Sequence, residues 1–173
     1  MKNTKVYLFA YGSMKQGFKN HYRLENDNLI GEAVTLQKYN MYPAESFNYP
    51  YGIEGESKWQ LHGELYELNT SDIEDIDIFE GTPDYYYRKE IEVICENKIY
   101  ATFIYFRTSA NPTGMDRDIS LYKWSKEFEF VGQKNEEFLE ALRVALIKKM
   151  DDLSQAKNDF LDTKIALSKN DIK

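Results

Sequence analysis

The chain has 173 residues, of which 42% are hydrophobic and 15% aromatic, and its formal net charge at pH 7 is −7. This composition predicts one globular domain, and the acidic balance argues against a nucleic-acid partner, which would require a basic face. One cysteine and two histidines exclude an internal disulfide and disfavour a structural zinc site. No apolar run approaches the roughly 20 residues that cross a bilayer. We therefore expect a cytoplasmic protein without a membrane span, metal or other cofactor.

The N-terminal segment combines a strand pattern with a glycine-containing turn. Residues 6–11, VYLFAY, are β-branched and aromatic, and they predict a buried strand rather than a signal peptide. Residues 12–17, GSMKQG, follow as a turn whose backbone N–H groups could form a cradle for an anion or an oxygen atom. A plain turn is the alternative, and the spacing fits neither a Walker motif nor a dinucleotide fingerprint.

The middle of the chain predicts mostly strands. A short helix is expected at 20–24, and 45–59 is a loop that includes a short strand near 51–53. Alternating or β-branched runs predict the remaining strands at 30–36, 38–42, 60–68, 88–95 and 98–106, the last two forming a hairpin.

Residues 71–80 predict the helix on which the functional interpretation depends. Ile73, Ile76 and Glu80 fall on one stripe of this helix, so the Glu80 carboxylate is directed toward the apolar side. Ser71 and Glu74 match a capping box at its start. A carboxylate facing a core costs free energy unless it is paired or used. Glu80 is therefore either a structural carboxylate paired with Arg88 or a tyrosine hydroxyl, or a general base in a partly dry pocket.

Gly81 and Pro83 end this helix, and a cluster of three tyrosines follows at 85–87. The secondary structure of 118–130 stays open on sequence grounds. From Asn135 onward there is no Gly or Pro, and an apolar residue recurs every seven positions, at Leu139, Leu146, Leu153, Phe160 and Leu167.

This heptad pattern predicts one long helix, or two with a break near 151–152. The helix either forms a coiled coil, which would make a homodimer, or packs on the chain's own core and frays. We expect a domain at 1–132 and a C-terminal helical extension at 133–173.

Three patches together resemble the γ-glutamylcyclotransferase-like, or AIG2-like, superfamily, and they look closest to its γ-glutamylamine cyclotransferase branch. They are LFAYGSMKQGFKNH at 8–21, GELYEL at 63–68 and DIFEGTPDYYYRKEIEV at 77–93. The resemblance covers roughly 5–108. Met14 stands where the family usually has Leu, which is nearly isosteric.

The resemblance implies an α+β fold around a mixed, partly closed β-barrel with flanking helices. It implies that Glu80 is the general acid/base. Tyr86 aligns with a family tyrosine that would bond a substrate carboxylate, fix Glu80 or pack in the core, and Arg88 is expected to form a structural ion pair. The turn that holds the γ-glutamyl or 5-oxoproline unit, largely through backbone atoms, would be Tyr11, Gly12, Ser13 and Met14.

The implied activity is conversion of a small-molecule γ-glutamyl-amine or other γ-glutamyl compound to 5-oxoproline and a free amine. Such an enzyme, of the acyltransferase or lyase type, would need no metal. One alternative is a non-catalytic module on the same fold that binds a small carboxylate or acts in assembly. Another is an enzyme for a specialised γ-glutamyl carrier. The group attached to the γ-glutamyl unit would be recognised by loops 45–59 and 109–122, which carry no recognisable code.

Overall fold

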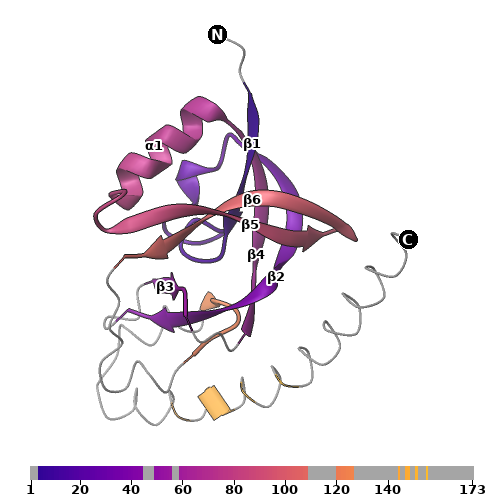
Figure 1. Ribbon diagram of the computed structural model, residues 1–173, viewed down its shortest axis with the longest axis vertical. Helices are drawn as coiled ribbons and strands as arrows, with labels where there is room; N and C mark the ends of the chain where they lie inside the picture. Colours follow the sequence, from indigo (N-terminus) through magenta and orange to yellow (C-terminus); the bar gives the residue numbers. More distant parts are fainter. Residues whose placement is uncertain are drawn as a thin grey trace.

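The computed structural model describes residues 4–44, 49–55, 59–108 and 120–126, and the single positions 144, 147, 148, 151 and 155. One α-helix packs beside a curved sheet in this part of the chain (Figure 1). The elements in order are β1 (Lys5–Ala10), the 3-10 helix η1 (His21–Arg23), β2 (Asn28–Pro43), β3 (Pro50–Ile53), β4 (Trp59–Asn69), α1 (Thr70–Glu80), β5 (Tyr86–Cys95) and β6 (Lys98–Arg107).

The strands form a barrel of five, and this architecture confirms the predicted α+β barrel. Strand order is β3-β2-β4-β1-β6-β5, and an additional pairing of β2 with β5 closes the ring over residues 33–35 and 93–95. β3 lies outside the ring as an antiparallel partner of β2. The sheet is mixed because β1 runs parallel to β6, whereas the other neighbouring strands are antiparallel.

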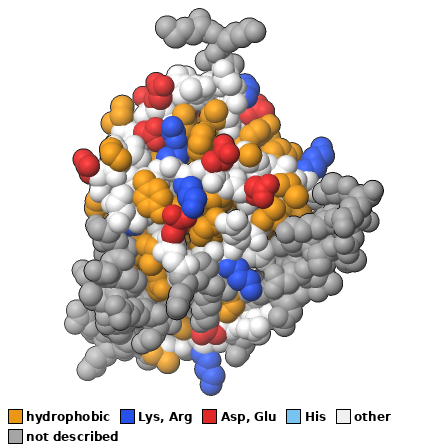
Figure 2. Space-filling view, viewed as in Figure 1, with side chains coloured by type: hydrophobic (Ala, Val, Ile, Leu, Met, Phe, Trp, Pro, Cys, Tyr) orange, Lys and Arg blue, Asp and Glu red, His pale blue; other side chains and the backbone are white. Residues whose placement is uncertain are grey.

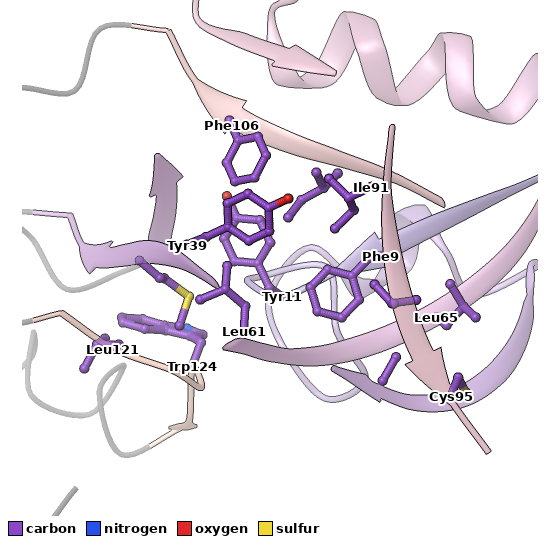
Figure 3. Packing of buried hydrophobic residues seen from close by; sticks show 14 residues of the cluster. Phe9, Tyr11, Tyr39, Leu61, Leu65, Ile91, Cys95, Phe106, Leu121 and Trp124 are labelled. Atoms are coloured by element: carbon purple, nitrogen blue, oxygen red, sulfur yellow. The ribbon is translucent and has the colours of Figure 1, made fainter. Parts of the chain in front are cut away.

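Alternation along β1 divides the core in two. Phe9 points into the barrel, where it packs with residues such as Leu61, Leu65 and Phe106 (Figure 3). Leu8 points the other way and packs in the cluster that includes Ile73 and Ile76 of α1. Successive side chains of a strand face opposite sides of a sheet, so one short strand supports both the barrel interior and the helix layer.

The N-terminal cap of α1 differs from the predicted one. The helix begins at Thr70, so Asn69 is the capping residue. The Asn69 backbone N–H and side-chain amide donate to Asp72 Oδ2 at 3.0 and 2.9 Å, and this pair replaces the predicted Ser71–Glu74 box. At the other end Gly81 ends the helix as predicted, with a left-handed φ of 65°.

Two predicted strands are one in the structure, and the predicted hairpin is confirmed. Residues 30–36 and 38–42 both belong to β2, whose pairing with β4 shifts register between Val34 and Lys38. β5 and β6 pair over their whole length around Glu96 and Asn97, which have φ values of 48° and 62°. Positive φ at both turn residues is typical of a two-residue hairpin turn.

The segment 120–126 covers one end of the barrel. Leu121 and Trp124 are buried in the barrel cluster, and the Leu121 N–H donates to the Met41 carbonyl at 2.7 Å. Within 118–130, whose structure the sequence left open, residues 120–125 are irregular apart from a parallel bridge between Lys123 and His62. The predicted extension 133–173 lies outside the described residues, apart from the five single positions, which are helical.

Charges of both signs are interspersed over the face of the molecule shown in Figure 2. Among the described residues, no helix is long and apolar enough to cross a membrane.

Candidate active site

A pocket of about 210 Å³ opens between the end of β1, the C-terminal end of α1, and β5 and β6. All six residues proposed from the sequence for catalysis or substrate binding line it. The lining residues are Phe9, Ala10, Tyr11, Gly12, Ser13, Met14, Asn20, Tyr49, Pro50, Phe79, Glu80, Tyr85, Tyr86 and Tyr105. Among the described residues no group of three or more His, Cys, Asp or Glu side chains is arranged to hold a metal ion.

Hydrogen bonds fix the turn that follows β1. The Gly12 carbonyl accepts from the Lys15 N–H at 3.2 Å, and the Ser13 carbonyl accepts from the Asn20 N–H at 2.9 Å. The Asn20 side-chain amide also donates to Ser13 Oγ at 2.9 Å. In the part of the chain that the structure describes, the N–H groups of Ser13 and Met14 donate no hydrogen bond. Two backbone donors are therefore available at the pocket wall.

Close contacts leave little room for a side chain at Gly12 and none at Gly63. A Cβ atom on Gly12 would lie 3.0 Å from Pro50 Cγ, and one on Gly63 would lie 2.4 Å from the carbonyl oxygen of Ala10. Gly63 on β4 thus lets β1 approach closely just before it enters the turn.

Tyr11 supports the pocket rather than offering a free hydroxyl. Its hydroxyl donates to the Tyr105 carbonyl at 2.8 Å and accepts from the Gly52 N–H at 2.8 Å. The residue is 7% exposed and is also part of the barrel cluster (Figure 3). It joins β1, β3 and β6, and burial raises the pKa of its hydroxyl well above the usual value.

Glu80 is the last residue of α1, and its side chain lines the pocket. Burial raises the pKa of this carboxyl group to about 7, and the nearby Arg23 guanidinium opposes that shift. The C-terminal end of a helix carries partial negative charge, so its position also disfavours the carboxylate form. Among the described residues, no side chain forms an ion pair or hydrogen bond with Glu80.

Arg88 pairs with Asp77 and not with Glu80. The sequence had left open an ion pair between Arg88 and a structural Glu80. Arg88 Nη1 donates to Asp77 Oδ2 at 2.7 Å, and the Tyr105 hydroxyl donates to Asp77 Oδ1 at 2.7 Å. Both strands of the hairpin are thereby joined to α1 one turn before Glu80. The structural ion pair expected for Arg88 is confirmed, with a different carboxylate as its partner.

Tyr86 presents an unpaired phenol to the pocket. The side chain is 7% exposed, and among the described residues its hydroxyl makes no hydrogen bond. Burial raises the pKa of the hydroxyl, and the neighbouring Tyr11 and Glu80 act in the same direction. The group therefore stays protonated and can donate a hydrogen bond to a bound oxygen atom.

Sequence reasoning did not assign several lining residues. Asn20 stands in the matched N-terminal patch, but its role in fixing Ser13 needed the coordinates. Tyr105 could have been found from alternation along β6, since Ile104 and Phe106 are fully buried on the opposite face. Tyr49 directly precedes β3, and Pro50 is its first residue. Both fall within 45–59, which was expected to contact the group attached to the γ-glutamyl unit, but no pattern singled out either residue.

The chain is thus a small α+β barrel whose pocket, lined largely by aromatic and apolar residues, holds one unpaired carboxylate beside a glycine turn. The family model described as gamma-glutamyl cyclotransferase, AIG2-like, matches residues 8–126. The chain belongs to this family.

Curated relatives carry corresponding names. A Methanocaldococcus jannaschii protein named "Putative gamma-glutamylcyclotransferase" is 39% identical over 102 residues, which are 58% of this chain and 82% of that protein. "Gamma-glutamylaminecyclotransferase C" of Danio rerio is 35% identical over 94 residues, 50% of this chain and 61% of that protein.

A solved structure agrees on the fold. The crystal structure of a Mus musculus AIG2-like protein superimposes with a TM-score of 0.62 and 21% identity. The match covers 71% of this chain and 90% of the mouse chain.

Proposed function

We propose that this protein is a gamma-glutamyl cyclotransferase that converts a γ-glutamyl-amine or another γ-glutamyl compound to 5-oxoproline and a free amine. The observation that carries the proposal is the unpaired Glu80 carboxyl group in the pocket beside the Gly12 turn. Membership of the family and the names of the relatives support this reaction class.

The reaction is an attack within one substrate molecule. The α-amino nitrogen attacks the γ-carbonyl carbon, a C–N bond forms, and Glu80 accepts the proton that the nitrogen loses. The bond from the γ-carbonyl carbon to the leaving nitrogen then breaks, and Glu80 returns the proton to that nitrogen. When the pocket holds the substrate in a bent conformation, much of the entropic cost of ring closure is removed from the barrier. Because one carboxyl group moves the proton in both steps, these two reaction steps require no cofactor.

Charge develops on the γ-carbonyl oxygen as the tetrahedral intermediate forms. The N–H groups of Ser13 and Met14 and the Tyr86 hydroxyl are the donors available for it. We assign the turn of Tyr11, Gly12, Ser13 and Met14 to binding the γ-glutamyl unit. A carboxyl group with a pKa near 7 suits general acid–base work at neutral pH, because both protonation states are accessible.

The test is release of 5-oxoproline by the Glu80→Gln variant. Glutamine keeps the shape but cannot exchange the proton, so we expect the rate to fall by about 10²- to 10⁴-fold. Glu74→Gln, on the exposed side of the same helix, is the matched control and should retain the parent rate.

Near-parent turnover by Glu80→Gln would remove Glu80 from the mechanism. A parent protein that binds 5-oxoproline but converts no γ-glutamyl substrate would favour the non-catalytic binding module instead.

A further inference from the structure

Arg88 projects from the same face of the β5–β6 hairpin as two tyrosines of the pocket. It follows Tyr86 by two residues on β5 and lies directly opposite Tyr105 in the register. Directly opposed residues of an antiparallel pair share a face, and residues two apart on a strand do so as well. Tyr86 and Tyr105 both line the pocket. The guanidinium group of Arg88 therefore lies on the side of the hairpin that faces α1.

Asp77 binds this guanidinium group one helical turn before Glu80. Arg88 Nη1 donates to Asp77 Oδ2 at 2.7 Å, and the two side chains are only 29% and 24% exposed. Residues three apart on a helix are neighbours, with Cβ atoms about 5–6 Å apart. A guanidinium group released from Asp77 would therefore have the Glu80 carboxyl group as its next acceptor on the same helix.

Two further contacts hold the ion pair in place. The other carboxylate oxygen of Asp77, Oδ1, accepts from the Tyr105 hydroxyl at 2.7 Å, so both oxygens of this carboxylate are engaged. Arg88 Cζ lies 4.6 Å from the ring centroid of Phe103 on β6, a distance at which a cation is attracted to the face of an aromatic ring. Asp77 is thus a fixed acceptor, and the Phe103 ring holds the cation beside it.

The other groups around Glu80 leave the Asp77–Arg88 pair as the point of control. Arg23 of η1 opposes the effect of burial on the pKa of Glu80. Arg107, at the end of β6, interacts with pocket tyrosines. Burial raises the pKa of three tyrosine hydroxyls that line the pocket from the end of β1, from β5 and from β6: Tyr11, Tyr86 and Tyr105. These hydroxyls stay neutral in the pH range of the proposed reaction.

We propose that Asp77 is a positioning residue, which holds the Arg88 guanidinium away from Glu80 and so leaves the Glu80 carboxyl group free to accept and return the proton. A carboxylate that is paired with a guanidinium group is a weaker base, because the pair favours its charged form. This inference rests on the proposed function. It gives the Asp77–Arg88 pair a role beyond joining the hairpin to α1.

The test is the pH profile of 5-oxoproline release in variants that remove one charge of the pair. Asp77→Asn keeps an acceptor for the Tyr105 hydroxyl but offers no charge to Arg88, whose guanidinium can then act on Glu80. We expect the acid limb of kcat/KM to move to lower pH by about one unit. Arg88→Met leaves the Asp77 carboxylate uncompensated beside Glu80, so it should move the acid limb to higher pH.

The double variant Asp77→Asn/Arg88→Met removes both charges and should return the acid limb close to its position in the parent. Asp75→Asn, on the exposed side of α1, is the matched control and should leave the profile unchanged. Opposite shifts in the two single variants distinguish positioning from a purely structural role. Loss of a structural pair would lower stability or kcat without moving the acid limb in two directions.

An NMR titration of the Glu80 side-chain carboxyl group, assigned with Glu80→Gln, measures the same shifts without turnover. No shift in the single variants, or shifts in the same direction, would overturn the inference while leaving the proposed function standing. If one single variant does not fold, the direction of the shift in the other decides. A parent protein that releases no 5-oxoproline would contradict the proposed function, and the titration would still show whether Asp77 keeps Arg88 from Glu80.

Discussion

Glu80 lies where a charged carboxylate is disfavoured, and this sets the expected pH dependence of the proposed activity. Burial raises the pKa of its carboxyl group to about 7. The protonated form cannot accept a proton from the α-amino group, so we expect kcat/KM to fall as the pH drops below about 7. The measurement is the rate of 5-oxoproline release between about pH 5 and pH 8. A level profile over this range would show that no group with this pKa acts as the base.

The same shift predicts that Glu80 lowers the stability of the folded protein at neutral and higher pH. The folded pKa of about 7 exceeds the ordinary 4.5, so folding favours the protonated form. This stabilising contribution is fully present below the unfolded pKa and is lost as the pH rises through about 7.

We therefore expect Glu80→Gln to unfold at a higher urea concentration than the parent above pH 7. The gain should be about 1–2 kcal/mol after allowance for the partial exposure of the side chain, and it should vanish near pH 4. Glu74→Gln should show no such pH-dependent difference. A Glu80→Gln protein that is less stable than the parent at high pH would contradict the prediction.

Helical periodicity predicted the direction of Glu80 but not its neighbours. Ile73, Ile76 and Glu80 share a stripe because of their spacing along one helix, and this spacing can be read directly from the sequence. Asp77 lies three residues before Glu80 and therefore close to the same face, so periodicity could not decide which of the two receives Arg88. The answer depends on how the β5–β6 hairpin docks against α1, and Tyr105 takes part in that contact.

At the scale of elements, the contact between β1 and β4 controls the position of the pocket turn. A methyl group on Gly63 would lie 2.4 Å from the Ala10 carbonyl oxygen and 2.8 Å from Phe9 Cζ. Gly63→Ala must therefore push the end of β1 away from β4. We expect a loss of about 1–3 kcal/mol in the free energy of unfolding, measured in urea, together with reduced 5-oxoproline release. Unchanged stability and activity would contradict this account of the close approach.

Strands were predicted well where alternation and turn residues agreed, and less well where the register is irregular. The hairpin around Glu96 and Asn97 was recognised from local sequence alone. The division of β2 into two strands was wrong, because a register shift between Val34 and Lys38 interrupts the alternation without ending the strand. The helix cap was misplaced by two residues, since Asn69 and Ser71 are both capable capping residues.

At the scale of the whole molecule, Lys15 joins the pocket turn to the segment that covers the barrel end. Its side chain is 4% exposed, and Nζ donates to the Trp124 carbonyl at 2.6 Å. We expect Lys15→Met to lower the free energy of unfolding by about 1.5–3 kcal/mol, because a charged hydrogen bond is lost inside the protein. Amide hydrogen exchange in 120–126 should become faster.

Lys19→Met is the control for this change, because Lys19 is exposed on the same stretch of chain. It should alter neither stability nor exchange. If Lys15→Met left exchange in 120–126 unchanged, the bond to Trp124 would not be what holds that segment on the barrel.

Contacts between residues far apart in the chain explain why local sequence patterns did not predict how the elements assemble. Nothing near Lys15 indicates a partner at position 124, and the closing pairs between residues 33–35 and 93–95 have no local signal. The barrel was predicted through the resemblance of three patches to a family, whereas the individual elements followed from local patterns.

The hairpin turn at Glu96 and Asn97 has a practical consequence. It stands at the opposite end of β5 and β6 from Tyr86 and Arg107, about 30 Å away along ten-residue strands. The single native thiol, Cys95, is 1% exposed. A cysteine introduced at exposed Lys98 would therefore be the accessible site for a fluorophore or a surface tether, and immobilisation through it would leave the pocket facing the solution.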